Sequence, residues 1–408
     1  MRIAVIFHRL GPYHCARLKA AAAGHCDITG IEVAAETQEY PWSATRGAEG
    51  YSRLTLFPSG NTRTMSDKQI STRVENALKD SAPDAVAIPG WSDNAALAAL
   101  RWCAESGTPA ILMSESTALD KPRSAWREWI KRRIVDLYST ALVGGERQVD
   151  YLIRLGMRRE RIFTGYDVVD NEYFRQKAEE VRGPAFAGLR PGSQGSAVRQ
   201  KYGLPENYFL ASARFIEKKN LPTLIRSYAR YRRLAANTDN RPWDLVLLGD
   251  GPFRETLNSQ LSTLSLQHSV LLPGFKQYEE LPVYYGLANA FVHASTTEQW
   301  GLVVNEAIAS GLPVIVSNRC GCVPELVEGN GFTFDPNNEH ELASRLFEMA
   351  SLSDDEHKRF EDASRRIAAN FGPERFGEGL KRAAELALIR PRKSSASSRM
   401  MTGMLARL

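Results

Sequence analysis

The chain has 408 residues and a mass of 45.4 kDa, more than one ordinary hydrophobic core accommodates, so we expect two domains. With 43 % apolar and 24 % charged residues, its composition is that of a folded globular protein and excludes a disordered or fibrous chain. The net charge of +5 is mild, so local basic segments matter more than the total.

The chain opens on an apolar run without a basic leader, and no run of about 18 apolar residues occurs in the sequence. Secretion and membrane spanning are therefore not expected. The five cysteines are scattered and include no C-x-x-C pair, which argues against a disulfide framework and against a zinc site. The expected location is a reduced cytoplasm.

The first half alternates short apolar runs with helical patterns, which predicts a parallel sheet covered by helices on both faces. Residues 1–178 are therefore interpreted as an N-terminal Rossmann-like domain. The clearest helices are Asp93–Glu105 and Ser124–Leu137. The expected strands are Arg2–Phe7, Asp27–Val33, Asp84–Pro89, Pro109–Met113, Ala141–Gly144 and Arg161–Thr164.

A stretch rich in Gly, Pro and Ser follows, and we interpret residues 179–204 as an interdomain linker. A second series of strands and helices predicts a C-terminal Rossmann-like domain over residues 205–372. An amphipathic helix is predicted within 373–390, and the polar, basic tail 391–408 is expected to be flexible. The second series has strands at Tyr208–Ala213, Asp244–Leu248, Val270–Pro273, Ala290–Ala294 and Pro313–Ser317, and helices from Leu221, Gly251, Tyr278, Leu302 and Glu339.

Ligands of an open parallel sheet bind at the carboxyl ends of the strands, so residues just past each apolar run are candidate binding residues. Arg214 and Lys219 follow one strand and place two cations there, with a solvated basic turn as the alternative. The next strand leads to a turn in which Gly249 and Gly251 allow the backbone to approach a ligand. Phe275 follows the third strand and is a candidate to lie against a planar base, with a core phenylalanine as the alternative.

The strand Ala290–Ala294 leads through a loop to a helix that begins at Leu302. The amides of Gly301 and Leu302, aided by the helix dipole, form an anion site suited to phosphate. Glu306 lies one turn inside this helix, and Glu298 lies in the loop on the other side. Two carboxylates beside an anion site suit a sugar nucleotide, because phosphates need donors and sugar hydroxyls need acceptors. Two structurally unrelated glutamates are the alternative.

Together these motifs resemble the retaining, family-4 type glycosyltransferases of the GT-B fold, also named glycosyl transferases group 1. Their E-x7-E motif is matched by Glu298-QWGLVVN-Glu306, and the family pattern continues through Gly311, Pro313, Gly321 and Glu325. Arg214 with Lys219, the GDGP and PGF turns and the segment VVDNEYF belong to the same resemblance. The resemblance covers essentially all of the second domain and the first domain in layout alone.

The resemblance implies a GT-B fold, in which two Rossmann-like doubly wound domains face a cleft and helix 373–390 crosses back to the N-terminal domain. It implies that Arg214 and Lys219 bind the diphosphate of a nucleotide sugar, and that Glu298 contacts the transferred sugar and Glu306 the ribose. The catalytic set on this basis is Glu298, Arg214 and Lys219. The remaining donor-binding candidates are Gly249, Gly251, Phe275, Trp300, Gly301, Leu302, Val303 and Glu306.

Four positions depart from the family pattern. The loop after the first strand has the single glycine Gly11 where Gly-Gly is common, and Ser114-Glu115-Ser116 stands where many members have a histidine. Trp300 replaces the motif phenylalanine, and Asn220 replaces a glycine. The candidates on the acceptor side are Gly11, His14, Trp91 and Glu115, and for His14 a packed or solvated histidine is the alternative.

The expected activity is retaining transfer of a hexose from a nucleotide-diphosphate sugar to a hydroxyl acceptor, in the synthesis of a polysaccharide, a glycolipid or another glycoconjugate. No Asp-x-Asp sequence occurs, so we expect no metal and no cofactor, and the cations and helix amides neutralise the leaving phosphate. The alternative function is a regulatory protein that binds sugar nucleotides without transferring them. No nucleic-acid partner is expected, and the missing G-x-G-x-x-G argues against a dehydrogenase.

The predicted helix within 123–137 combines Trp126 and Trp129 with several arginines and lysines. A basic amphipathic helix with tryptophans suits the surface of an anionic membrane, and hence a lipid-linked acceptor met at its inner face. The alternative is a helix that packs its apolar stripe on its own sheet and leaves its basic face to solvent.

Overall fold

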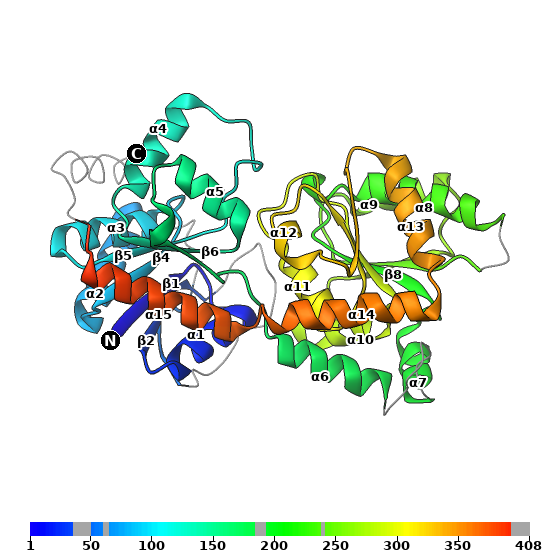
Figure 1. Cartoon of the computed structure of the whole chain (residues 1–408), viewed down its shortest axis with the longest axis horizontal. Helices are drawn as coiled ribbons and strands as arrows, with labels where there is room; N and C mark the ends of the chain where they lie inside the picture. Colours follow the sequence, from blue (N-terminus) through cyan, green and yellow to red (C-terminus); the bar gives the residue numbers. More distant parts are fainter. Residues whose placement is uncertain (36–49, 60–64, 184–192, 238–240, 393–408) are drawn as a thin grey trace. The chain divides into compact units, whose positions relative to one another are not determined.

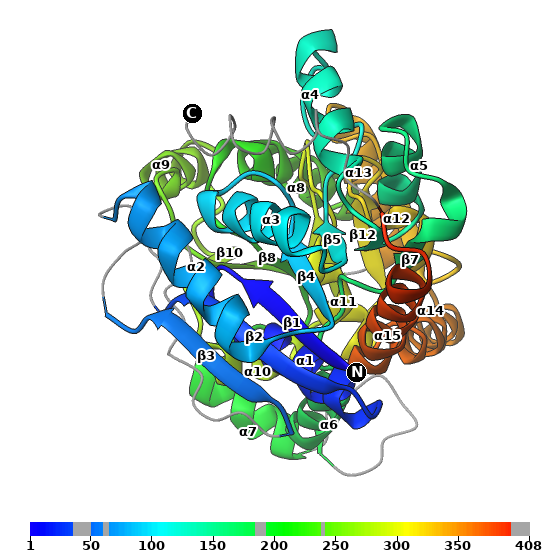
Figure 2. The ribbon, with the colours of Figure 1, turned by 90° about the vertical axis from the view of Figure 1, so that its left-hand side faces the viewer.

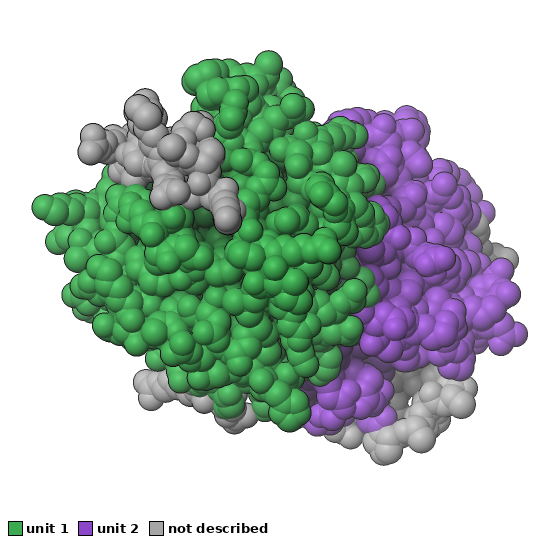
Figure 3. Space-filling model, turned by 60° about the vertical axis from the view of Figure 1, so that its left-hand side comes forward, with its two compact units in different colours: residues 1–170, 372–408 green, residues 171–371 purple. Residues whose placement is uncertain are grey.

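The computed structural model divides the chain into two compact units, coloured separately in Figure 3. Unit 1 consists of residues 1–170 and 372–408, and unit 2 of residues 171–371. The structure describes residues 1–35, 50–59, 65–183, 193–237 and 241–392.

Unit 1 contains a seven-stranded parallel sheet with the order β3-β2-β1-β4-β5-β6-β7 (Figure 1). Its strands are β1 Arg2–Phe7, β2 Asp27–Ala34, β3 Ser52–Phe57, β4 Ala85–Pro89, β5 Ala110–Ser114, β6 Thr140–Val143 and β7 Ile162–Thr164. Its helices are α1 Pro12–Ala23, α2 Asp67–Ser81, α3 Asn94–Ser106, α4 Ala125–Val135, α5 Glu146–Arg154, the 3-10 turn η2 Arg159–Arg161 and α15 Pro373–Ile389. Side chains of α2, α3 and α5 join one core, and those of α1 and α15 join another, so helices cover both faces of the sheet.

Unit 2 contains a six-stranded parallel sheet with the order β10-β9-β8-β11-β12-β13. Its strands are β8 Tyr208–Ser212, β9 Asp244–Leu248, β10 Val270–Gly274, β11 Ala290–His293, β12 Val314–Ser317 and β13 Gly331–Phe334. Its helices are α6 Asn171–Arg182, α7 Ser193–Tyr202, α8 Leu221–Ala235, α9 Arg254–Thr263, α10 Leu281–Leu287, α11 Leu302–Ala309, α12 Val323–Leu326, α13 Glu339–Ala350 and α14 Asp354–Ala369, with 3-10 turns η3 Glu217–Lys219 and η4 Tyr278–Glu280. One large core joins α8, α9 and α13 to the sheet.

Two doubly wound parallel sheets of this kind confirm the predicted fold class. The return of the last helix to the N-terminal unit is confirmed as well, because α15 packs on α1. Phe376, Leu380 and Ala384 of α15 are fully buried in the core of unit 1. Gly377 permits the close approach, since a Cβ there would lie 2.9 Å from the carbonyl oxygen of Ala20.

The structure differs from the expected elements at two edge strands. Neither β3 nor β13 was predicted, and each lies at the end of its sheet. Both are incompletely buried: in β3, Ser52 is exposed and Leu54 is 38 % exposed, so its apolar pattern is weak. The other strands and the main helices lie within a few residues of their predicted bounds.

The expected linker 179–204 also differs, because helices occupy most of its described part. The end of α6 and the whole of α7 lie there, and the boundary between the units falls at Asp170, before the expected residue 178. Arg182 Nε donates to the carbonyl oxygen of Gly286 (2.7 Å), and Arg199 Nη2 donates to that of Leu287 (2.8 Å). These bonds fasten both helices to the end of α10 in unit 2. Residues 184–192 and most of the predicted tail, 393–408, lie outside the described residues.

Candidate functional site

The carboxyl ends of β8 and β11 lie side by side, because the two strands are hydrogen-bonded neighbours. After β8 the chain passes through the half-buried Arg214 to η3, which ends at Lys219. After β11 it forms the loop that carries Glu298 and then enters α11. The N–H of Thr296 donates to the carbonyl oxygen of Lys218 (2.9 Å) and ties the two loops together. Residues that are 79 positions apart thus meet at one sheet edge.

Glu298 is the centre of a charged cluster at this edge. Its Oε2 accepts hydrogen bonds from Lys219 Nζ and from Ser295 Oγ (3.2 Å), and Lys218 Nζ lies 3.7 Å from its Oε1. The side chains of Lys219 and Glu298 are only 13 % and 12 % exposed. Burial acts to raise the pKa of Glu298, but the charge of Lys219 and a hydrogen bond from His293 outweigh burial and hold the pKa well below its usual range. Glu298 is therefore a carboxylate that stays ionised although it is nearly buried.

His293, which the sequence analysis missed, completes this cluster. It is the last residue of β11, it is buried, and its Nε2 lies 3.2 Å from Glu298 Oε2. Burial lowers the pKa of His293, and the charge of Lys219 lowers it further, so the ring is neutral at pH 7 and donates from Nε2 to the carboxylate. The sequence did contain a signal for His293, because it is a histidine at the carboxyl end of an apolar strand, five residues before Glu298.

The second glutamate of the motif lies in α11 and is buried. Gly301 precedes this helix with φ of +108°, a left-handed conformation that favours glycine, and Leu302 and Val303 follow half-buried in the first turn. Glu306 lies against the phenol of Tyr285 from α10, and Ser212 at the end of β8 lies against the same phenol. Burial and the charge of Glu306 raise the pKa of Tyr285 far above its usual value. The structure thus brings Glu306 to the end of β8, the strand that leads to Lys219.

The donor-binding candidate Trp300 has a buried side chain. Its side chain is 1 % exposed, and its Nε1 donates to Asn305 Oδ1 (2.8 Å), so the indole is enclosed by protein. Burying a ring of this size while satisfying its N–H stabilises the loop between Glu298 and α11. The expected contact of the Trp300 side chain with the donor does not fit this position.

The GDGP turn after β9 packs against the segment that carries Arg214. A Cβ at Gly249 would lie 1.9 Å from the carbonyl oxygen of Ala213, and one at Gly251 would lie 2.7 Å from that of Phe215. Both glycines also have positive φ, of +122° and +151°. The close approach that requires glycine is therefore to residues 213–215, where we had expected an approach to a ligand. Phe275, after β10, is 37 % exposed at the same end of the sheet.

The four acceptor-side candidates follow three neighbouring strands of unit 1. Gly11 and His14 follow β1, Trp91 follows β4, and Glu115 follows β5. The N–H of Gly11 donates to His14 Nδ1 (3.1 Å), and burial together with the charge of Arg17 lowers the pKa of His14 to about 3. His14 is thus a neutral histidine packed on Phe7. Trp91 is half-buried against the core.

Beside these candidates lie two buried ionisable side chains, Arg17 and Asp167, that the sequence analysis missed. Arg17 Nη2 lies 4.0 Å from Asp167 Oδ1, its Nε donates to the carbonyl oxygen of Val168 (3.0 Å), and both side chains are almost inaccessible to solvent. Burial and the neighbouring charge of Glu115 raise the pKa of Asp167 well above its usual range. The carboxyl group of Asp167 therefore resists ionisation, although the guanidinium of Arg17 lies beside it.

Comparison with known proteins adds to this geometry. Residues 196–367 match the protein family described as "Glycosyl transferases group 1". An alpha-monoglucosyldiacylglycerol synthase of Streptococcus pneumoniae is 31 % identical over 179 residues, which are 43 % of this chain and 39 % of that protein. A GDP-mannose-dependent phosphatidylinositol monomannoside mannosyltransferase of Mycolicibacterium smegmatis is 30 % identical over 41 % of this chain and 48 % of its own length. The chain thus spans less than half the length of these curated relatives.

Solved structures resemble the chain over nearly its whole length. A glycosyltransferase from Rickettsia africae covers 94 % of this chain and 98 % of its own with a TM-score of 0.67 and 15 % identity. HepE from Anabaena, in complex with UDP and glucose, covers 93 % of this chain and 98 % of its own with a TM-score of 0.66 and 18 % identity. At this identity the likeness shows the fold, which is GT-B. Residues 196–367, which carry the Glu298 and Glu306 motif, are thus similar to the glycosyl transferases group 1 family.

Proposed function

We propose that the protein is a retaining glycosyltransferase that moves a hexose from a nucleotide-diphosphate sugar to a hydroxyl acceptor. The observation that carries the proposal is the ion cluster in which Lys219 and Glu298 meet at the carboxyl ends of β8 and β11, beside the start of α11. The family match of residues 196–367 supports the use of a nucleotide sugar.

The donor diphosphate binds to the cations of this edge. Lys219 and Arg214 come from the loop after β8, and the first amides of α11 add the positive end of the helix dipole. Without donor, Lys219 is neutralised by Glu298, so each side chain keeps the other charged and in place. When a diphosphate arrives, Lys219 binds its oxygens, and Glu298 accepts hydrogen bonds from the hydroxyls of the sugar. Glu306 accepts from the ribose.

In the proposed transfer step the enzyme stabilises the departing diphosphate and supplies no nucleophile of its own. The bond between the anomeric carbon and the phosphate oxygen breaks, and the acceptor oxygen bonds to the same carbon from the same face, which retains the configuration. The acceptor proton passes to the departing phosphate oxygen. Arg214 and Lys219 stabilise the charge that develops on the diphosphate. These side chains supply the neutralisation for which other glycosyltransferases use a metal, so the proposal includes none.

The acceptor side belongs to unit 1 in this proposal. Gly11, His14, Trp91 and Glu115 surround the ends of three adjacent strands, and Glu115 is the charged group among them. We infer a glycan or lipid-linked acceptor, because the relatives include enzymes named for lipid products. The chain would then work in the cytoplasm, with peripheral contact through 123–137 at the inner membrane face. None of the helices in the described ranges has the length and apolarity that crossing a bilayer requires.

Thermal unfolding with UDP-, GDP- and ADP-sugars, followed by assays of donor hydrolysis and transfer, tests the proposal. A true donor at 100 times its dissociation constant stabilises the fold by about 2.7 kcal/mol. The Lys219→Ala variant should lose this stabilisation, and the Lys358→Ala variant, which changes an exposed lysine of α14, should keep it. Stabilisation without hydrolysis or transfer would favour the regulatory alternative, and no stabilisation by any sugar nucleotide would contradict both.

A further inference from the structure

Two tryptophans lie exposed and stacked on helix α4. Trp126 is 65 % and Trp129 44 % exposed, and their ring centroids are 5.1 Å apart with an angle of 12° between the planes. Ile134 and Val135, at the far end of the helix, are buried in the core, and Ile130, one turn before Ile134, packs partly buried against it. Figures 1 and 2 show α4 projecting from the sheet of unit 1. Packing of the apolar stripe on the sheet therefore explains only the end of α4, and the tryptophans need another partner.

The exposed side of α4 carries positive charge. Arg127, Arg132 and Arg133 are all exposed, and none of the ion pairs between described residues involves them. The guanidinium of Arg133 lies over the ring of Trp129, 5.4 Å from its centroid. Cations and aromatic rings are thus presented together on one surface, which is complementary to an anionic and partly apolar partner.

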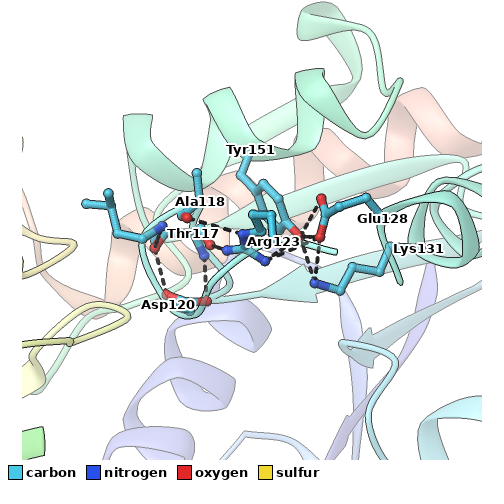
Figure 4. A network of polar contacts seen from close by, with 8 residues as sticks. Thr117, Ala118, Asp120, Arg123, Glu128, Lys131 and Tyr151 are labelled. Atoms are coloured by element: carbon cyan, nitrogen blue, oxygen red, sulfur yellow. Dashed lines mark hydrogen bonds and ion pairs between the residues drawn. The ribbon is translucent and has the colours of Figure 1, made fainter. Parts of the chain in front are cut away.

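The remaining charges of α4 and the chain before it hold the helix in place (Figure 4). The ring of Tyr151, from α5, lies 4.4 Å from the guanidinium of Arg123, and its hydroxyl accepts a hydrogen bond from Lys131 Nζ (2.8 Å). The same hydroxyl lies 2.9 Å from Glu128 Oε1, to which it donates. The acidic residue of α4 is therefore turned toward α5 and does not neutralise the exposed arginines. A network connected in this way makes the orientation of the helix a fixed feature of unit 1.

An open hollow of about 330 Å³ lies beside Trp129. Its charged lining residues are Arg132, Arg133, Asp136 and Arg392, and its apolar lining includes Trp129, Leu155 and Met157. The guanidinium of Arg392 pairs with Asp136, and the backbone N–H of Arg392 donates to Ser139 Oγ (3.1 Å). A hollow of this size lies within the range of small-ligand sites, and three guanidinium groups against the single carboxylate of Asp136 leave a net positive charge that suits a phosphodiester.

We propose that α4 and this hollow form a docking site for anionic phospholipid, in which Trp126 and Trp129 enter the interfacial layer and the arginines bind lipid phosphates. One headgroup phosphate occupies the hollow between Arg132, Arg133 and Arg392. This site would be the surface at which the proposed enzyme reaches a lipid-linked acceptor. Only this connection to the acceptor rests on the proposed function. A zwitterionic surface lacks the charge that the arginines require.

Flotation of the full chain with vesicles tests the site without any sugar donor. We expect binding to phosphatidylcholine vesicles that contain phosphatidylglycerol, none to phosphatidylcholine alone, and a blue shift of tryptophan emission on binding. The triple variant R127Q/R132Q/R133Q should weaken binding on the order of 100-fold. The control K201Q/R233Q/R366Q removes the same charge from exposed positions of unit 2 and should leave binding nearly unchanged.

Two further variants separate the parts of the site. W126S/W129S should abolish the blue shift and the binding at moderate salt while preserving the melting temperature, because both rings are exposed. R392Q should reduce the preference for phosphatidylglycerol several-fold, whereas R390Q, two residues earlier and not part of the lining of the hollow, should not.

Equal binding to both vesicle types, equal loss in the two triple variants, or undiminished binding of W126S/W129S would overturn the docking site. So would binding to nucleic acid or to an acidic protein with no binding to vesicles. The nucleotide-sugar assays are independent of vesicles, so failure of the docking site leaves the donor site standing, and the reverse holds as well.

Discussion

Unit 1 and unit 2 each bury a carboxyl group near their strand ends, and the two groups ionise in opposite directions. Glu298 of unit 2 has its pKa held well below the usual range, whereas the pKa of Asp167 in unit 1 is raised well above it. Both lie out of water, so burial alone does not decide the outcome. Lys219 touches Glu298 directly, but Arg17 stands 4.0 Å from Asp167, with a second carboxyl group, Glu115, beside it.

The donor-side candidates of unit 2 and the acceptor-side candidates of unit 1 also differ in their charge and contacts. In unit 2 the loops after β8 and β11 place cations, a carboxylate and a neutral histidine in one hydrogen-bonded cluster. In unit 1, His14 after β1 is neutral and packed against Phe7, and Glu115 after β5 lies beside Asp167, whose carboxyl group resists ionisation. An ionised cluster at a strand end is suited to hold a charged ligand. The ionised cluster supports our proposal that unit 2 binds the donor.

Removal of the cation from unit 2 should have the largest effect. In Lys219→Met, the proposed transfer should fall by roughly 100-fold or more, because one charge-stabilising donor is typically worth about 3 kcal/mol. The value of kcat/KM with the donor found by thermal unfolding measures this loss. Lys218→Met is the matched control, since it removes the same charge from the same loop at 3.7 Å from Glu298, and its loss should be much smaller. Equal losses in the two variants would contradict the special place of Lys219.

Loss of the carboxylate should cost stability in a pH-dependent way. Glu298→Gln leaves Lys219 nearly buried without its anion, which should lower the free energy of unfolding by about 3 kcal/mol at pH 7. Because the folded pKa of Glu298 lies below its ordinary value of 4.5, its contribution is present above pH 4.5 and disappears as the pH falls through the folded pKa. Urea unfolding of wild type and variant should therefore converge in acid. A constant difference at every pH would contradict this assignment, and Glu279→Gln, which changes an exposed glutamate, is the control.

The carboxyl group of unit 1 should show the opposite dependence. Its folded pKa is above the ordinary value of 3.8, so Asp167 costs stability progressively as the pH rises above 3.8 toward the folded pKa. Asp167→Asn removes this cost, and each unit between the folded and unfolded pKa values adds about 1.4 kcal/mol to the advantage of the variant. Unfolding curves from pH 4 to pH 8 measure the widening gap. Asp80→Asn, at an exposed position of α2, should show none, and a variant less stable at pH 8 than at pH 4 relative to wild type would mean that Asp167 is ionised.

The smallest effect is expected at Trp300. Phenylalanine, the residue usual in the motif, fills most of the same space but leaves Asn305 Oδ1 without its buried donor, so Trp300→Phe should lower stability by about 1 to 2 kcal/mol. The affinity for the donor, measured by titration calorimetry, should change little because the ring is enclosed. A tenfold weaker affinity at unchanged stability would restore the direct contact that the sequence suggested.

Most strands and the placement of the two motif glutamates could be predicted, because they depend on residues that are neighbours along the chain. Alternating apolar runs located eleven of the strands, and spacing alone placed Glu298 and Glu306 on either side of a helix start. The pattern failed to predict β3 and β13, because these short and partly exposed strands lack a clear apolar pattern. The helices of the expected linker were missed for a related reason, since bonds from Arg182 and Arg199 to α10 stabilise a segment whose own composition favours a loop.

The sequence by itself determined the two parallel-sheet domains, the E-x7-E pair and the strand ends at which Arg214 and Lys219 lie, because hydrophobic periodicity and turn residues act locally. Only the tertiary structure decided which of these side chains meet, that His293 joins Glu298, that Trp300 is enclosed, and that Trp126 and Trp129 face outward. Burial and ionisation are set by whatever packs against a residue from distant parts of the chain. Asp167 and Glu298 differ for this reason, although each is an acidic residue just beyond an apolar run.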